Sequence, residues 1–393
     1  MGLRTVVVRL GAGFVLLVSV ACGAMIADEP SDPVPLEGDG AATDSSSQEA
    51  PSAVDGGRVT RPAATCSLAP GPSCVLEECV RRTLHVSESP GAPHGIVSDA
   101  SFVYWLEQPA TNDGYNGHAP ARVLRVDKVG ATDESRTTPL ASDQMAATAI
   151  ALDGEWLYWT VYDKGTERIA KLRRVRADCG GGCVPEEVAV LPPGIRIMKL
   201  VRGAPGVLFG AGEAGDVFRF TVKGDLAKTT GPLITKKGVG SVVVTDEYVY
   251  AAGLQDSTIA RMDPEGASVV PAFIKLPRVD AGDQGVSHVW TDCREAWATR
   301  GPTSVLRLAL GDGGAETLRN DIALSVYGLA GDATYLYIAG ANEGLAAFDL
   351  TTNVLTLLHG GKVFNVAADA EGVYWGEHDI DKQAAGTIYM IVK

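Results

Sequence analysis

The stretch Ala149–Asp153 (AIALD), followed at once by Trp156–Thr160 (WLYWT), is the clearest copy of a unit that decides the fold of this chain. The unit is a short apolar strand that ends in Asp or Gly, a tight turn, and a second strand rich in Tyr and Trp. Seven copies follow residue 95, and their first strands end at Asp99, Asp153, Gly203, Asp246, Asp292, Asp332 and Asp369. The spacings of 54, 50, 43, 46, 40 and 37 residues are typical of one four-stranded blade per repeat.

The rest of each repeat predicts two further strands. Five copies carry a triplet centred on Arg that we interpret as the third strand: Leu124-Arg125-Val126, Leu172-Arg173-Arg174, Phe218-Arg219-Phe220, Ala260-Arg261-Met262 and Leu306-Arg307-Leu308. A fourth apolar patch precedes the next repeat, at Leu140, Leu191, Leu233, Phe273, Leu318 and Leu357. We therefore predict an all-β chain, a β-propeller of seven four-stranded blades. Six blades is the alternative, because the Gly203 and Asp292 copies match the pattern least well.

The two ends of the repeat region predict how the ring closes. The last repeat stops at its third strand, Thr387–Val392, whereas Leu84–Val86 is a strand-like piece without a repeat of its own. Pairing of this N-terminal strand with the last blade would cover a sheet edge that is otherwise open. The propeller is then expected over residues 83–393, a length that suits seven blades of about 40–45 residues each.

The repeated Asp and Arg residues are expected to be structural. Each Asp lies at the turn between the first and second strands, where a carboxylate accepts hydrogen bonds from nearby backbone N–H groups. The second-strand Tyr and Trp residues are expected to form the core between blades. The third-strand Arg residues are expected to be half-exposed partners for carboxylates.

Residues 1–21 have the pattern of a signal peptide. Their apolar stretch, Leu10–Ala21, is too short to cross a bilayer as a stable helix. Val18–Cys22 resembles the cleavage motif of bacterial lipoproteins, which implies that Cys22 becomes the lipid-carrying first residue. Ordinary cleavage near Ala24 or Ala27 is the alternative. Both predict export, and lipidation predicts an anchor in the cell envelope, at the outer membrane or in the periplasm of a Gram-negative cell.

A tether and a linker are predicted between the signal peptide and the propeller. Residues 22–65 are rich in Asp, Glu, Ser, Pro, Ala and Gly and have no sustained apolar period. Such a segment cannot bury enough apolar surface to offset the entropy of ordering it. Residues 66–82 are interpreted as a cysteine-bearing linker.

Six cysteines remain when Cys22 is set aside, and an even number in an exported chain predicts disulfides. Cys179 and Cys183 are expected to bridge the turn between the third and fourth strands of one blade. The other candidates are Cys66, Cys74, Cys79 and Cys293, so one bridge would join the N-terminal segment to the propeller. Zinc at the Cys179–Cys183 pair is the alternative, but no second pair of ligands stands at zinc-site spacing.

The formal net charge of −14 limits the partners. Such a charge repels nucleic acid and anionic lipid head groups. We therefore expect no nucleic-acid binding, and membrane contact only through the lipid anchor.

The repeat resembles two groups of propellers. Leu157-Tyr158-Trp159-Thr160 resembles the YWTD repeat of receptor ectodomains, and Val103–Trp105 and Val373–Trp375 match its core. Over essentially the whole chain, the sequence is more similar to lipoprotein propellers of myxobacteria and related bacteria. Those are built on I-A-V-D-x-x-x-V-Y-W units behind a lipoprotein signal and a cysteine-bearing linker. This resemblance implies an exported propeller and no particular ligand.

A functional site is expected in loops that do not repeat. Propellers usually bind ligands on the face where second-to-third-strand loops meet the links to the next blade. Loops Glu107–Ala121 and Gly376–Gly386 lie on that face, in blades that ring closure brings side by side. The binding-rim candidates are His94, Asp113, Tyr115, His118, Glu377, His378, Asp379 and Asp381.

This rim has three interpretations. As a binding surface it would recognise a protein, peptide or glycan. As an active site it would use Glu377 with His378 or His118 as general acid and base around a divalent cation such as Ca²⁺ or Mg²⁺. That arrangement is similar to streptogramin-lyase propellers, whose His and Glu spacing is not reproduced here. In the third interpretation the loops are solvated polar turns. We prefer a binding or scaffold module and assign it no catalytic residue, cofactor or metal.

Overall fold

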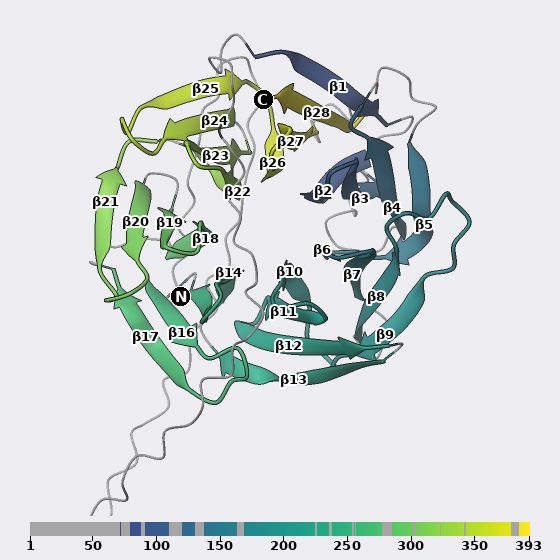
Figure 1. Cartoon of the computed structure of the whole chain (residues 1–393), viewed down its shortest axis with the longest axis horizontal. Coiled ribbons are helices and arrows are strands. Elements are labelled where there is room, and N and C mark those ends of the chain that lie inside the picture. Colours follow the sequence, from purple (N-terminus) through teal and green to yellow (C-terminus); the bar gives the residue numbers. More distant parts are fainter. Residues whose placement is uncertain are drawn as a thin grey trace, which may run out of the picture. The chain divides into compact units, whose positions relative to one another are not determined.

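The computed structural model describes residues 71, 79–87, 91–109, 120–129, 137–162, 169–224, 226–235, 238–253, 255, 257–276, 285–301, 304–322, 324–341, 343–378 and 385–393. All of them belong to the compact unit that spans residues 60–393. The described residues form seven four-stranded antiparallel sheets arranged in a ring, with the first strand of each blade innermost (Figure 1). The predicted seven-bladed propeller is confirmed, and the six-bladed alternative is wrong.

The strands follow the predicted order. Blade 1 contains β2 (Gly91–Ser98), β3 (Phe102–Pro109), β4 (Pro120–Asp127) and β5 (Thr138–Met145), and blade 2 contains β6 (Ala149–Asp153), β7 (Trp156–Tyr162), β8 (Ala170–Arg176) and β9 (Glu186–Val190). Blade 3 contains β10 (Ile197–Arg202), β11 (Val207–Gly212), β12 (Asp216–Lys223) and β13 (Leu226–Thr235), and blade 4 contains β14 (Val239–Val244), β15 (Val249–Gly253), β16 (Thr258–Met262) and β17 (Val269–Lys275). Blade 5 contains β18 (Val286–Thr291), β19 (Glu295–Arg300), β20 (Ser304–Ala309) and β21 (Ala315–Arg319), and blade 6 contains β22 (Val326–Gly331), β23 (Tyr335–Gly340), β24 (Gly344–Asp349) and β25 (Leu355–His359).

Blade 7 closes the ring as predicted. Its sheet contains β26 (Val363–Ala368), β27 (Gly372–Glu377) and β28 (Thr387–Val392), and β1 (Arg81–Val86) pairs antiparallel with the outer side of β28. The two ends of the repeat region are thereby held in one sheet. The fourth strand of this blade therefore comes from the N-terminal side of the repeat region.

The core lies between neighbouring blades. Trp105, Trp159 and Trp375 of the second strands are fully buried. One cluster joins Trp105 of blade 1 to Tyr374 and Ile388 of blade 7, and the other clusters join other neighbouring blades in the same way. The predicted role of the second-strand aromatic residues is therefore confirmed.

Most of the anchor aspartates accept hydrogen bonds at their own turn. The Asp99 carboxylate accepts from the backbone N–H groups of Ser101 and Phe102, both at 2.8 Å, and from the Tyr104 hydroxyl at 2.7 Å. Asp332 and Asp369 repeat this set of three bonds. The carboxylate thus satisfies donors that the turn would otherwise leave unpaired.

Two anchors depart from the predicted pattern. In blade 4 the hydroxyl of Thr245, and not the carboxylate of Asp246, accepts from the backbone N–H of Tyr248. Asp246 is exposed, so its assignment as an anchor is wrong. In blade 2, Asp153 accepts from the Gly206 backbone of the next blade.

The third-strand arginines have two kinds of partner. Arg219 pairs with Glu265 at 3.0 Å, and Arg307 pairs with Glu295, as predicted. Arg125 and Arg261 instead lie over aromatic rings, with Arg261 3.8 Å from the ring centre of Phe273. The flat guanidinium stacks well on such a ring, so a carboxylate is not needed there.

The cysteines agree with the prediction as far as the described residues extend. Cys179 and Cys183 form a disulfide across the turn between β8 and β9. Cys79 and Cys293 are also disulfide-bonded. Cys22, Cys66 and Cys74 lie outside the described residues, as do residues 1–70 with the predicted signal peptide and tether. Within the described residues, no helix has the length and apolar character needed to span a membrane.

Candidate functional site

A bulge recurs near the start of the inner strands. In six of the seven blades, the pairing of the first strand with the second shifts by one residue there. The residues left over are Gly95, Met198, Gly240, Ser287, Tyr327 and Phe364. A bulge changes the direction of the side chains around it. In this protein it occurs where the inner strands line the centre of the ring.

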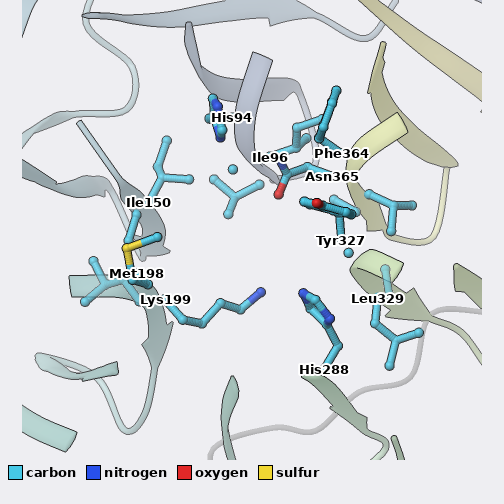
Figure 2. A pocket seen from close by; sticks show the side chains of 18 of the residues that line it. His94, Ile96, Ile150, Met198, Lys199, His288, Tyr327, Leu329, Phe364 and Asn365 are labelled. Atoms are coloured by element: carbon cyan, nitrogen blue, oxygen red, sulfur yellow. The ribbon is translucent and has the colours of Figure 1, made fainter. Parts of the chain in front are cut away.

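These inner strands enclose a central cavity of about 1070 Å³. Its lining reaches from the start of the inner strands, at His94 and Arg196, to their ends, at Ser98 and Arg202. Figure 2 shows side chains from several blades that project into this space. The volume is at the upper end of the range of roughly 300–1,000 Å³ that is usual for ligand sites.

Lys199 and His288 face each other in the cavity. Lys199 comes from the inner strand of blade 3 and His288 from that of blade 5, and their nitrogen atoms point toward one another (Figure 2). Burial lowers the pKa of Lys199. Burial and, next, the charge of Lys199 lower the pKa of His288 to about 3, so the imidazole is neutral at physiological pH.

One ring nitrogen of His288 makes no hydrogen bond within the described part of the chain. Its ring hydrogen-bonds the backbone of Tyr327, whereas Nδ1 is buried without a hydrogen-bond partner in the described part of the chain. A neutral imidazole that donates from one nitrogen has a lone pair on the other. Nδ1 is therefore an acceptor that protein atoms leave unused.

The side of the cavity formed by blades 6 and 7 combines an aromatic surface with an amide. Tyr327 is 51% exposed although it lies in the middle of the ring, and Phe364 packs edge-on against it with ring centres 5.5 Å apart. Asn365 follows Phe364 and also lines the cavity. Across the cavity, Met198 is 43% exposed. Apolar surface left open next to polar groups is typical of a binding site.

Among the predicted rim residues that the structure describes, His94 lines the cavity. Burial, together with the charges of His378 and Arg196, lowers the pKa of His94 to about 4. His378 is thus close enough to His94 to affect its pKa. His378 itself is 1% exposed, and its backbone N–H donates to the carbonyl of Lys362.

Glu377 lies outside the cavity lining and has a partner between the blades. Its Oε2 is 2.8 Å from Nε2 of His359, which belongs to the outer strand of blade 6. The ring of His359 in turn packs 5.5 Å from that of Trp375. The corresponding positions at the junction of blades 7 and 1 are Glu107, His85 and Trp105. The repetition indicates an inter-blade contact for Glu377.

The remaining rim candidates lie outside the described residues. They are Asp113, Tyr115, His118, Asp379 and Asp381. The structure thus brings together His94 and His378 from the predicted set, and it places Glu377 in a different contact. Among the described residues, no group of three or more His, Cys, Asp or Glu side chains is placed to hold a metal ion.

Sequence reasoning missed Lys199, His288, Tyr327 and Asn365. A signal was nevertheless present, because these residues stand four or five positions before the anchor of their repeat. At the fourth position three of the other copies have small side chains, Gly95, Ala149 and Gly328, and the blade 4 copy has the apolar Val242. A large polar residue at one fixed position of a repeat indicates a role that the other repeats do not share.

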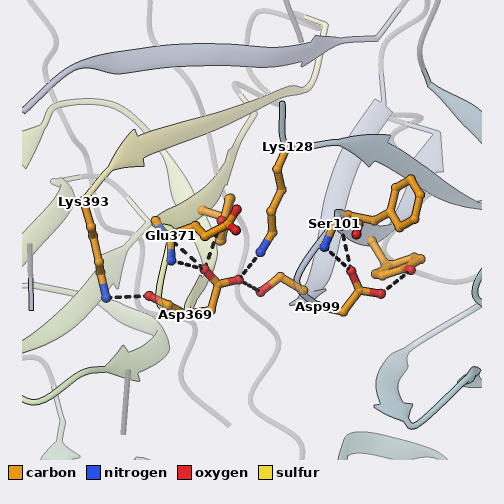
Figure 3. A network of polar contacts seen from close by, with 11 residues as sticks. Asp99, Ser101, Lys128, Asp369, Glu371 and Lys393 are labelled. Atoms are coloured by element: carbon orange, nitrogen blue, oxygen red, sulfur yellow. Dashed lines mark hydrogen bonds and ion pairs between the residues drawn. The ribbon is translucent and has the colours of Figure 1, made fainter. Parts of the chain in front are cut away.

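The far ends of the inner strands carry a polar network that borders the cavity at Ser98 and Asp369 (Figure 3). The buried ammonium of Lys393 lies 2.7 Å from Asp332 and donates to the backbone carbonyl of Asp369 at 2.8 Å. The buried ammonium of Lys128 pairs with the Asp369 carboxylate, which Ser98 also contacts. This network links blades 6, 7 and 1, and its charges are paired.

Solved structures share this fold. A catalytically inactive variant of virginiamycin B lyase from Staphylococcus aureus, with quinupristin, is similar over 80% of this chain and 100% of its own, with a TM-score of 0.58 and 12% identity. The WD40 repeats of RRP9 are similar over 80% of this chain and 97% of their own, with a TM-score of 0.58 and 10% identity.

No protein-family model and no curated protein sequence matches the chain. At identities this low, a shared fold does not imply a shared activity. The comparisons therefore establish that the chain is a β-propeller, a fold that commonly serves as a binding or scaffold module.

Proposed function

We propose that this protein is an exported, lipid-anchored propeller that binds a ligand in its central cavity and acts as a binding module at the cell envelope. The observation that carries the proposal is a central cavity of about 1070 Å³ into which Lys199, His288, Tyr327 and Asn365 project from separate blades, with Nδ1 of His288 left without a partner in the described chain. The apolar stretch before Cys22 and the acidic segment after it support the location.

A binding role is favoured over the enzymatic alternative. The general acid or base of that alternative, Glu377, is engaged with His359 between two blades. The cavity groups, by contrast, are an amine, imidazoles, an amide and aromatic rings from separate blades. Such a set can hold a ligand by charge, hydrogen bonding and apolar contact.

Photocross-linking from inside the cavity tests the proposal. The photoreactive amino acid p-benzoylphenylalanine replaces Tyr327 in the full chain, in the native cell, and Val354 serves as the control. Val354 is 54% exposed near the outer strand of the same blade, so the two sites have similar exposure but different surroundings. We expect an adduct at position 327 that is absent at 354 and that Met198→Trp, which fills the cavity, removes.

Two results would contradict the proposal. An adduct at position 354 alone would place binding on the outer surface, and the absence of adducts at both positions would count against a binding module. The location has its own test. Cys22→Ala is expected to move the protein from the membrane fraction to the soluble fraction, and unchanged fractionation would exclude the lipid anchor.

A further inference from the structure

The cationic side chains that line the cavity differ in their partners. Arg196 lies 3.7 Å from the Glu213 carboxylate, and Arg202 lies 2.8 Å from that of Asp153. Lys199 has no carboxylate within ion-pair distance among the described residues. Since the other two charges are neutralised locally, Lys199 is the amine in the cavity that lacks a carboxylate partner within the described chain.

An ammonium held in this way favours an anionic ligand. Removing a charge from water without a partner costs free energy, and burial lowers the pKa of Lys199 for this reason. A carboxylate beside Nζ would supply a charge-assisted hydrogen bond, which is about twice as strong as a neutral one.

The groups around Lys199 favour a ligand that also carries hydroxyl groups. Nδ1 of His288 is a buried acceptor without a partner in the described structure, and the His288 ring lies opposite the side chain of Lys199 across the cavity. A hydroxyl can donate to it, whereas a second carboxylate cannot. The Asn365 amide, on the same wall as Tyr327, offers a further donor and acceptor.

The exposed ring of Tyr327 favours a cyclic ligand. Its face is held by the edge-on contact with Phe364, with an angle of 85° between the ring planes. The C–H groups of a sugar ring pack on such an aromatic face, while the sugar hydroxyls remain free to hydrogen-bond.

We propose that the central cavity binds a hydroxylated carboxylate of the sugar-acid class, with its carboxylate on Lys199, a hydroxyl on Nδ1 of His288 and its ring on Tyr327. The ligand is either a free sugar acid or the uronate unit of an acidic glycan, which share this chemistry. The inference rests on the proposed function, because it assigns a ligand class to the same cavity.

Chemical protection of Lys199 tests the inference. The purified protein is reductively methylated with formaldehyde and borohydride, and the modification of each lysine is measured by mass spectrometry. The probes are methyl glucuronide, digalacturonate, methyl glucoside and inorganic phosphate. We expect at least one of the two uronates to lower methylation of Lys199 at least fivefold while exposed Lys275 is unchanged. Protection by methyl glucuronide indicates a free sugar acid, and protection by digalacturonate alone indicates a glycan unit.

Calorimetric titration of variants adds a matched control. Lys199→Gln is expected to weaken binding of the protecting uronate at least tenfold. Lys275→Gln makes the same change of charge on the outer strand β17, and its affinity is expected to stay within twofold of the unmodified protein. Circular dichroism and the thermal transition establish that both variants are folded.

The inference is overturned if methyl glucoside or phosphate protects Lys199 as well as the uronates do, or if neither uronate protects it. Failure of the ligand class and failure of the binding function can be told apart. A cavity adduct at position 327 without any effect of uronates rejects the sugar acid and keeps the binding module. The absence of both the adduct and protection rejects both.

Discussion

The two ends of the inner strands use polar side chains in opposite ways. At the anchor turns, Asp99 and Asp332 accept bonds from two backbone N–H groups and a tyrosine hydroxyl each, and the buried Lys393 pairs with Asp332. In the central cavity, Lys199 lacks an ion-pair partner within the described chain, and Nδ1 of His288 has no donor. The carboxylates of these anchor turns are satisfied by their own protein, whereas Lys199 and Nδ1 of His288 lack such partners in the described chain.

The largest effect is expected when a polar side chain that already has all its partners is removed from an anchor turn. Asp332→Ala leaves the buried ammonium of Lys393 without its carboxylate and the Tyr337 hydroxyl without its acceptor. Breaking a buried ion pair by removing one partner costs about 3–5 kcal/mol. We expect a loss of this size in the free energy of unfolding, measured by denaturant titration.

Asp246→Ala is the matched control for that prediction. Asp246 occupies the sequence position predicted for an anchor but is exposed, and Thr245 makes the turn contact instead. Its removal is expected to change the free energy of unfolding by less than about 0.5 kcal/mol. Equal losses for both aspartates would show that the anchor contacts do not stabilise the ring.

The second prediction concerns the response of the cavity to acid. Unfolded His288 binds a proton below about pH 6.5, whereas folded His288 resists protonation until about pH 3, because it is buried and faces Lys199. Between these values the unfolded state binds more protons, so stability falls as the pH falls. One such group contributes a slope of up to about 1.4 kcal/mol per pH unit.

The measurement is the free energy of unfolding of the protein and of His288→Asn between pH 7 and pH 4. We expect a shallower dependence in the variant, because Asn does not titrate. Identical slopes would mean that His288 becomes protonated as readily in the folded chain as in the unfolded one, and the cavity would then not exclude the charge.

The smallest effect is expected at Glu377, which separates an inter-blade contact from a catalytic one. Glu377→Gln keeps the shape of the side chain and removes its charge beside His359. We expect a loss of about 1 kcal/mol in the free energy of unfolding, the usual size for one hydrogen bond, and an unchanged cross-link at position 327. Loss of that cross-link in a folded variant would place Glu377 in the binding site.

The fold was accessible from the sequence because its determinants are local and repeated. Alternating apolar residues and turn residues specify each strand, and an aromatic second strand such as Trp156–Tyr162 has the same environment in each blade. Even the closure by β1 could be predicted, since a last repeat without a fourth strand leaves an edge that needs a partner. The number of blades and the Cys179–Cys183 disulfide followed from the same kind of reasoning.

The candidate site was harder to predict from the sequence. His94 and His378 were predicted because they lie in loops or at strand ends, where polar residues are expected to form a binding site. Lys199 and His288 were missed because they lie within the inner strands, which the repeat pattern assigns a structural role. The bulge that sets their direction depends on pairing between two strands, and a pattern with a period of two residues does not contain it.

The sequence by itself determined the seven repeats, their strands and turns, and the closure of the ring, because each of these depends on residues close together in the chain or on one unpaired edge. The tertiary structure alone decided which side chains share the cavity. Lys199, His288 and Tyr327 belong to three separate blades, and they meet only because the ring brings their inner strands around one axis. Whether a polar side chain in the cavity has a hydrogen-bond partner depends on this arrangement of the blades, since its neighbours come from distant repeats.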